Sequence, residues 1–144
     1  MDHLPEAARI RRGVMRLNRR LRQERGDGSL SANQLLVLGH LHRHGSATPG
    51  EVAAAERQRP QSLTRVFAEL EEDGLIAREP GTVDRRQSVL SLTGQGRRAL
   101  ERDMADRDAW LSGALASLSP TERGVLELAA ALMERLADAG DAED

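Results

Sequence analysis

The sequence predicts a mainly helical fold of the α+β class that carries one two-stranded β-hairpin. Two observations predict this class. Apolar residues recur at intervals of three and four positions along most of the 144 residues, which is the period of a helix face. Residues 75–92 break this period, because two short runs, 75–78 and 88–92, flank a loop that contains Pro80 and Gly81, as is typical of a hairpin.

The first predicted helix lies in the N-terminal region. Four apolar residues spaced by four, three and four positions share one of its faces: Ile10, Val14, Leu17 and Leu21. Arginines surround the rest of this helix. The Gly26–Ser29 stretch then interrupts the helical pattern.

Three further helix starts carry capping boxes, in which the first hydroxyl and the fourth side chain satisfy each other's free backbone amides. The first box predicts a helix that ends near Gly45, the second a short helix through Ala55, and the third a helix over about 120–138. The boxes are Ser31–Gln34, Thr48–Glu51 and Ser119–Glu122.

The remaining helices are predicted from their period. One begins at Pro60 and runs to about Asp73, and Gly74 follows its end, where a left-handed conformation is needed. Another covers about 95–115. The apolar residues expected on the inner faces of these helices are Leu35, Leu38, Leu41, Leu63, Phe67, Leu70, Leu100, Met104, Leu111 and Leu115.

A pair of helices joined by a tight turn and followed by a β-hairpin is the plan of a winged helix-turn-helix. The helix that begins at Pro60 is its candidate recognition helix, whose N-terminal side chains would face the edges of the DNA bases. Hydrogen-bonding side chains lie near that end, whereas the acidic residues, which would repel phosphate, lie at the far end. Taken alone, the pattern is equally compatible with an ordinary amphipathic helix.

The net charge of −2 conceals an uneven distribution. Residues 1–30 carry a net +4 and residues 57–98 a net +2, whereas residues 99–144 carry −7. Every basic side chain is arginine, which makes planar, bidentate contacts with phosphate or guanine. Only two residues, Phe67 and Trp110, are aromatic, which argues against a protein that stacks single-stranded bases.

Several classes of protein are excluded or disfavoured. The absence of cysteine excludes disulfides, thiol catalysis and cysteine-based metal sites. We expect neither an enzyme nor a cofactor, because no G-x-S-x-G motif and no carboxylate pair beside a histidine is present. The longest apolar run, 128–133, is far shorter than the roughly 20 residues of a membrane span. We therefore expect a cytoplasmic protein with no membrane partner.

The hairpin region carries the most specific motif. Asp84–Gln87 followed by Leu92–Gly96 resembles the D-x-R-x5-L-T-x-x-G signature of the MarR family (multiple antibiotic resistance regulators), matched at every position. The flanking helical patterns are similar to the dimerisation helices of that family. Further upstream matches are Leu30–Gln34, Thr48–Ala53 and Leu70–Ile76.

The resemblance implies one MarR-like domain over residues 1–144. It implies a winged helix-turn-helix DNA-binding lobe over 31–92 and helical dimerisation regions over 1–28 and 95–140. One stretch departs from the family pattern. The family usually has an apolar residue and a glycine before the recognition helix and then a serine cap, whereas this sequence has Glu56, Arg57, Gln58 and Arg59 there. We expect a weaker cap and a more basic approach to the helix.

We expect major-groove contacts from the start of the recognition helix, and phosphate or minor-groove contacts from the wing. A bidentate pair of Arg65 with guanine would be worth about 1–3 kcal/mol of discrimination. The resemblance implies that Asp84 braces the wing by pairing with an arginine and does not touch DNA. The recognition-helix candidates are Arg59, Pro60, Gln61, Ser62, Thr64 and Arg65, and the wing candidates are Arg85, Arg86 and Gln87.

These features predict a homodimeric transcriptional regulator, most often a repressor in this family, that binds a pseudo-palindromic operator in double-stranded DNA. The resemblance further implies a small lipophilic or phenolic effector between the dimerisation helices and the DNA-binding lobe. Arginines of the first helix could bind such an anion, and they could equally be solvated. The alternative function is a winged-helix module that binds an acidic protein partner without specific DNA binding.

A histidine pair is a separate candidate site. His40 and His44 lie four residues apart and therefore share a helix face, which is compatible with a metal site. No third ligand is evident beyond His3 or a carboxylate, and a solvated helix end explains the pair equally well. We therefore expect no metal.

Overall fold

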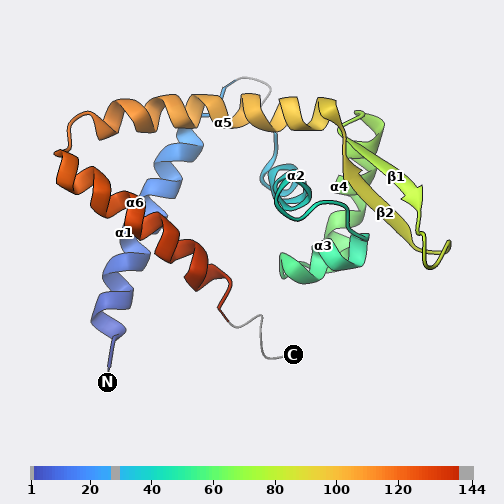
Figure 1. Ribbon diagram of the computed structural model, residues 1–144, viewed down its shortest axis with the longest axis horizontal. Coiled ribbons are helices and arrows are strands. Elements are labelled where there is room, and N and C mark those ends of the chain that lie inside the picture. The colour runs from blue at the N-terminus through green and yellow to red at the C-terminus, as the bar shows by residue number, and fades with distance from the viewer. Residues whose placement is uncertain (1, 27–29, 140–144) are drawn as a thin grey trace. The chain divides into compact units, whose positions relative to one another are not determined.

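The computed structural model describes residues 2–26 and 30–139. Within these residues, six helices and two strands follow one another in the predicted order (Figure 1). The mainly helical α+β class with one two-stranded sheet is therefore confirmed. The elements are α1 (Leu4–Gln23), α2 (Ala32–His44), α3 (Pro49–Ala55), α4 (Pro60–Glu72), β1 (Ile76–Pro80), β2 (Ser88–Leu92), α5 (Gly94–Leu115) and α6 (Pro120–Ala137).

All three predicted capping boxes are formed. The side chains of Ser31, Thr48 and Ser119 each accept a 3.1 Å hydrogen bond from the backbone amide three residues later. In return, the side chain three residues later accepts from the backbone amide of each capping residue. The hydrogen bonds from the backbone and side chain of Ser119 lower the pKa of Glu122, because they favour its ionised form.

The hairpin pairs β1 with β2 in antiparallel register, with Pro80 opposite Ser88 at its outer end. The predicted bounds of the first strand, 75–78, are wrong at both ends. Leu75 instead belongs to the turn after α4, where its amide donates to the carbonyl of Leu70 at 2.9 Å. Pro80, expected in the loop, ends β1, because an edge strand tolerates a residue that has no N–H group.

The loop after α2 joins the hairpin. Gly45 has a φ of 80° and turns the chain at the predicted end of α2. Ala47 then exchanges two backbone hydrogen bonds with Leu90 of β2, at 3.0 and 2.8 Å. This bridge, which the sequence pattern does not predict, attaches β2 to the helices.

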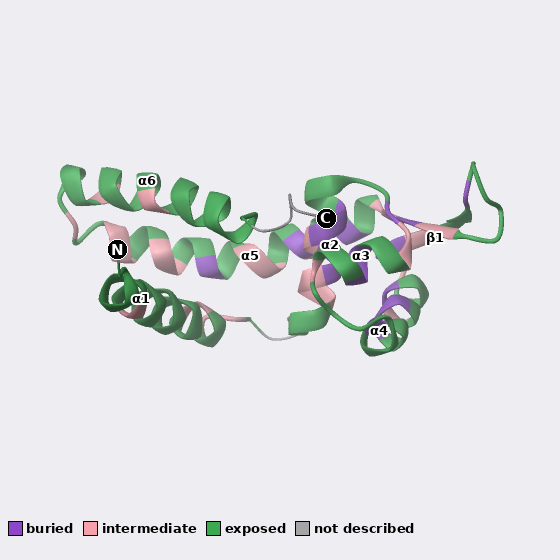
Figure 2. Ribbon diagram, turned by 90° about the horizontal axis from the view of Figure 1, so that it is seen from below, coloured by how far each residue is buried: buried purple, intermediate pink, exposed green. Residues whose placement is uncertain are grey.

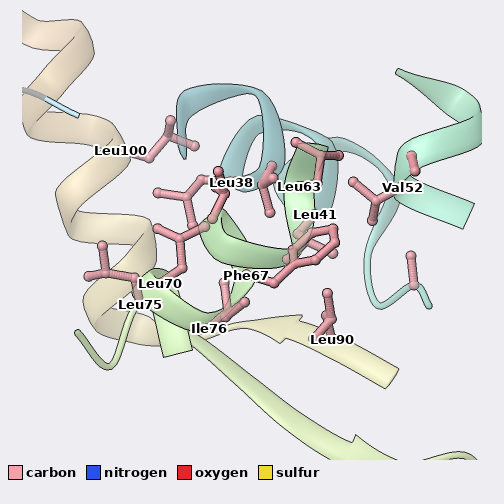
Figure 3. Close-up of a cluster of buried hydrophobic side chains, with 14 residues drawn as sticks. Leu38, Leu41, Val52, Leu63, Phe67, Leu70, Leu75, Ile76, Leu90 and Leu100 are labelled. Carbon is pink, nitrogen blue, oxygen red and sulfur yellow. The ribbon is translucent and has the colours of Figure 1, made fainter. Parts of the chain in front are cut away.

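The hydrophobic core lies among α2, α3, α4, the hairpin and the first turns of α5 (Figure 3). Most of the predicted inward residues are buried there: Leu38, Leu41, Leu63, Phe67, Leu70 and Leu100. Leu35 and Met104 are partly buried against this cluster. Since one core contacts both helices of the helix-turn-helix and both strands, it fixes α4 relative to the wing.

The chain divides into two compact units, Met1–Arg107 and Asp108–Asp144, with the boundary inside α5. Neither α1 nor α6 contains a buried residue, and Figure 2 shows both helices mostly in the colour of exposed residues. The large exposed apolar side chains of α1 and α6 are Leu4, Ile10, Val14, Met15, Leu17, Val125, Leu126, Leu128, Leu132, Met133 and Leu136.

None of the helices formed by the described residues is both long enough and apolar enough to cross a lipid bilayer.

Candidate nucleic-acid interface

The first turns of α4 bring the predicted recognition residues to the surface. Leu63, Val66 and Phe67 are buried on one side of the helix and therefore fix which side faces outward. The residues on the outward side are exposed: Arg59, Pro60, Gln61, Ser62, Thr64 and Arg65. The structure therefore brings the six candidates of this helix together on one surface, and their contacts with DNA remain a prediction.

The start of α4 lacks a side-chain cap, as expected from the missing serine. Arg59 occupies the N-cap position, has extended backbone angles and makes no capping hydrogen bond with its side chain. Pro60 at the first helical position has no amide, and the amide of Ser62 donates to the carbonyl of Arg59 at 3.0 Å. Exposed amides and the helix dipole at such an end are favourable to a phosphate group.

Arg65 is an exposed cation of this face that forms an ion pair within α4. Its side chain is 90% exposed, and its Nε donates to Glu69 Oε1 at 3.1 Å, one helical turn away. This hydrogen bond uses only the Nε, whereas a bidentate contact with guanine can use the terminal guanidinium nitrogens. An exposed pair of this kind contributes only about 0–1 kcal/mol, so DNA can compete with Glu69 at little cost.

The wing loop is closed by backbone hydrogen bonds. The amide of Gly81 donates to the carbonyl of Gln87 at 2.7 Å, and the amide of Gln87 donates to the carbonyl of Asp84 at 3.1 Å. Asp84 Oδ1 accepts from the backbone amide of Arg86 at 2.9 Å. The carboxylate thus contacts an arginine through its backbone amide, and the role of Asp84 as a brace of the wing stays a prediction.

The wing presents its cations to solvent. Arg85, Arg86 and Gln87 are all exposed. Within the described part of the chain, neither Arg85 nor Arg86 takes part in an ion pair. Both guanidinium groups are therefore available to a phosphate or to a narrow minor groove.

The second half of the wing motif, Leu92–Gly96, holds the hairpin against the helices. The Thr93 hydroxyl lies 2.7 Å from the carbonyl oxygen of Gly74 and 3.0 Å from that of Leu75, and it accepts from the amide of Gly96 at 2.9 Å. A Cβ atom on Gly96 would overlap the carbonyl oxygen of Leu75. The Thr93–Gly96 segment therefore lets the start of α5 approach the start of β1, and it fixes the base of the wing.

Comparisons with known proteins agree with this geometry. A family model described as the MarR family matches residues 29–87. An HTH-type transcriptional regulator of Mycobacterium tuberculosis is 40% identical to this chain, and the match covers 87% of each protein. The chain belongs to the MarR family. The predicted winged helix-turn-helix resemblance is thereby confirmed, and with it a role in transcription regulation through DNA binding.

Other MarR-type relatives support the same assignment. The HTH-type transcriptional repressor MdtR of Bacillus subtilis is 37% identical over 77% of this chain and 70% of its own length. A transcriptional regulator of Pseudomonas aeruginosa, known from its crystal structure, is 41% identical, with a TM-score of 0.77 over 93% of this chain and 94% of that one. BpsR of Bordetella bronchiseptica shares the fold at 24% identity and a TM-score of 0.65, and its DNA binding is regulated by 6-hydroxynicotinic acid.

The turn before α4 keeps a glycine-type geometry without glycine. Arg57 has a φ of 53° and is the one described residue other than glycine with positive φ. The amide of Arg57 donates to the carbonyl of Ala54 at 3.2 Å, and the amide of Gln58 donates to that of Ala53 at 2.8 Å, which is a Schellman motif. Arg57 therefore adopts the left-handed conformation at the end of α3 that favours glycine.

A solvated helix end is one explanation that the sequence offers for His40 and His44. This explanation is wrong for His40, which is buried. His40 is only 5% exposed, and its Nδ1 lies 3.1 Å from Glu56 Oε1, while its ring centroid lies 4.7 Å from that of His44. Glu56 Oε1 also accepts from a terminal nitrogen of Arg43 at 3.2 Å. Among the described residues, no three His, Cys, Asp or Glu side chains are grouped in a way that could hold a metal ion.

A partly open cavity of about 300 Å³ lies among α1, α2 and α5. Arg107, which lines it, pairs with Asp103 at 2.7 Å, and Asp103 also accepts from the amide of Leu30 at 2.9 Å. The Nε of Arg25 is buried and has no hydrogen-bond partner among the described residues. The lining residues are Asn18, Leu21, Arg22, Arg25, Ala32, Leu35, Met104 and Arg107.

Proposed function

We propose that this chain is a sequence-specific repressor that binds a pseudo-palindromic operator as a homodimer and responds to a small effector. The arrangement of α4 and the wing supports the DNA contact. Hydrogen-bonding and cationic side chains are exposed over the first turns of α4, and Arg85 and Arg86 are exposed at the wing. The α4 acids lie toward its far end, where they stay away from phosphate. The proposal includes no catalytic step.

The exposed apolar faces of α1 and α6 support a homodimer. Large contiguous apolar patches are uncommon on monomeric proteins and mark interfaces. Residues 1–28 and 95–140 are the proposed dimerisation regions, with 31–92 as the DNA-binding lobe. A two-fold dimer presents two recognition helices to one face of the duplex.

The cavity among α1, α2 and α5 supports a small anionic effector with an apolar body. Leu21, Leu35 and Met104 supply apolar surface, whereas Arg22 and Arg25 supply positive charge. The unpartnered Nε of Arg25 is a donor that a carboxylate or phenolate oxygen could satisfy. That BpsR responds to 6-hydroxynicotinic acid is an example of such a ligand in a protein of this fold.

The test of the proposed function is a gel shift with the DNA upstream of the chain's own gene, followed by footprinting of any bound segment. We expect protection on one face of a pseudo-palindrome. Arg65→Ala should weaken binding to this site and relax the preference at one position in each half-site, because a bidentate contact is worth about 1–3 kcal/mol. Arg65→Lys is the control, because it keeps the positive charge but loses the planar guanidinium fork, so it should relax the preference at the same position without the loss of charge.

Two other outcomes would change the proposal. Equal affinity for the upstream segment and for scrambled DNA would refute sequence-specific binding. It would favour the alternative of a winged-helix module for an acidic protein partner. For the effector, a thermal-shift screen of aromatic acids should give a stabilisation that Arg25→Ala removes, and a shift that is unchanged in Arg25→Ala would place the ligand elsewhere.

A further inference from the structure

The turn that connects α3 to α4 decides where the proposed recognition helix begins. It contains Glu56 as the C-cap residue of α3, Arg57 in the left-handed conformation, and Arg59 as the N-cap residue of α4. A left-handed residue with a Cβ atom is strained, and such a conformation persists only where neighbouring contacts hold it. The amides of Arg57 and Gln58 donate to carbonyls of α3, and α4 adds no side-chain cap at Arg59.

Glu56 supplies a contact from outside the turn. Its Oε1 lies 3.1 Å from His40 Nδ1 and accepts from a terminal nitrogen of Arg43 at 3.2 Å, and both partners belong to α2. An ionised carboxylate can only accept hydrogen bonds, so this contact forms with the tautomer of His40 that carries a proton on Nδ1. We refer to Glu56, His40 and Arg43 as the Glu56 cluster.

The burial of the cluster makes it a fixed point. The His40 side chain is 6% exposed and that of Glu56 is 21% exposed, whereas that of Arg43 is 58% exposed. The α4 and β2 side chains in the core beside α2 are apolar, namely Leu63, Phe67, Leu70 and Leu90. The charged and titratable groups at His40 are therefore Glu56 from the turn, with Arg43 and His44 from α2.

We infer that Glu56 is a positioning residue for DNA recognition. Its hydrogen bonds hold the strained turn on α2 and thereby set the position of α4 relative to α2, although the carboxylate itself does not contact DNA. The inference rests on the proposed function, in which α4 enters the major groove. A glycine at position 57 would adopt the turn without strain, so this chain uses a side-chain contact where the usual family sequence uses backbone freedom.

The charge of Glu56 and its positioning role predict opposite effects on operator affinity when its side chain is removed. Removal of a carboxylate near DNA should tighten binding if only its charge matters. If Glu56 positions the turn, Glu56→Ala should weaken operator binding by about tenfold, the scale of mutations that act through a contact network. Glu56→Gln keeps an oxygen that accepts from His40 and Arg43 while removing the charge, so it should bind at least as tightly as the natural chain.

The measurement is a titration of fluorescent operator DNA at several salt concentrations. Glu56→Ala should keep the natural slope of log affinity against log salt, because no phosphate contact is lost. Glu72→Ala is the control, since it removes an exposed acid from the far end of α4 and should bind like the natural chain or slightly more tightly. Equal affinities of the Glu56→Ala and Glu56→Gln variants would overturn the inference.

A second variant covers the case in which Glu56→Ala does not fold. If Glu56→Ala is unfolded at the assay temperature by circular dichroism, Arg43→Ala replaces it. This variant removes the more exposed of the two donors. It should weaken operator binding without a change in the slope of log affinity against log salt. Unchanged operator affinity would overturn the inference, and so would a slope reduced by about 1.8 per dimer, which would mean two lost phosphate contacts. Failure of the proposed function is seen separately, because the natural chain would then show no preference for any operator.

Discussion

At the scale of single residues, the carboxylate of Asp84 has two roles in the wing, as a negative charge and as a hydrogen-bond acceptor. Asp84 places a negative charge beside two arginines that we expect to contact DNA, and its charge alone would oppose binding. Its Oδ1, however, accepts the amide of Arg86 at 2.9 Å and closes the turn at the tip of the wing. The two roles predict opposite effects when this side chain is removed.

We expect Asp84→Ala to weaken operator binding by about twofold to tenfold, because one hydrogen bond has a net value of about 0.5–1.5 kcal/mol. Asp84→Asn keeps a carbonyl oxygen that can accept from the Arg86 amide but has no charge, so it should bind at least as tightly as the natural chain. Fluorescence anisotropy measures the operator affinity of the natural chain and of both variants. Tighter binding by Asp84→Ala would mean that the carboxylate acts only through its charge.

Arg86 itself should act on all DNA sequences alike. Its guanidinium is exposed and belongs to no ion pair of the described residues, so we expect it to neutralise a phosphate or to enter a minor groove. Arg86→Ala should weaken binding to operator and scrambled DNA by similar factors and reduce the salt slope by about 1.8 per dimer. The same slope as in the natural chain would show that this arginine contacts no phosphate.

At the scale of helices and strands, local chemistry was sufficient to predict the helix starts that carry capping boxes, whereas the bounds of β1 and the contacts between distant residues were not predictable. The capping boxes at Ser31, Thr48 and Ser119 need only four consecutive residues, and all three form. The left-handed conformation at residue 57 has glycine as its sequence signal, and arginine gives no such signal. The contact between His40 and Glu56 joins residues 16 positions apart, which no helical period relates.

The close approach of α5 to β1 gives a prediction for stability. Gly96→Ala should lower the free energy of unfolding by about 1–3 kcal/mol, because the new Cβ atom would overlap the backbone of Leu75 and neither backbone can move freely. Gly113→Ala, in the same helix, is the control. Apart from its chain neighbours and the backbone of its own helix, no atom of the described residues lies within 4 Å of the new Cβ, so this variant should raise stability by about 0.5–1 kcal/mol.

Urea denaturation followed by circular dichroism measures both variants. The midpoint for Gly96→Ala should fall while that for Gly113→Ala rises, with similar slopes for the two transitions. A Gly96→Ala protein as stable as the natural chain would show that α5 and β1 do not require this close approach.

At the scale of the whole molecule, the surface of α6 contains more apolar area than one chain covers. Val125, Leu128, Leu132 and Leu136 recur at spacings of three and four residues, and between 43% and 66% of each residue's surface is exposed. A partner that covers this stripe would remove it from water, at about 25 cal/mol for each Å². In the proposed dimer, the second chain covers the stripe and supplies the second recognition helix, so dimerisation and operator affinity should fail together.

Leu128→Glu tests this coupling, because a carboxylate in the stripe would be buried without a partner in a dimer but exposed in a separate chain. We expect light scattering to report about 15.8 kDa for this variant and about twice that mass for the natural chain. Affinity for an operator with half-site centres about 10–10.5 base pairs apart should fall to the affinity for a single half-site. Ala131→Glu adds the same charge between Glu127 and Glu134 on the polar side of α6, and it should leave both the mass and the affinity unchanged. A Leu128→Glu protein that remains a dimer would place the interface elsewhere, and a monomer with full operator affinity would separate DNA recognition from two-fold assembly.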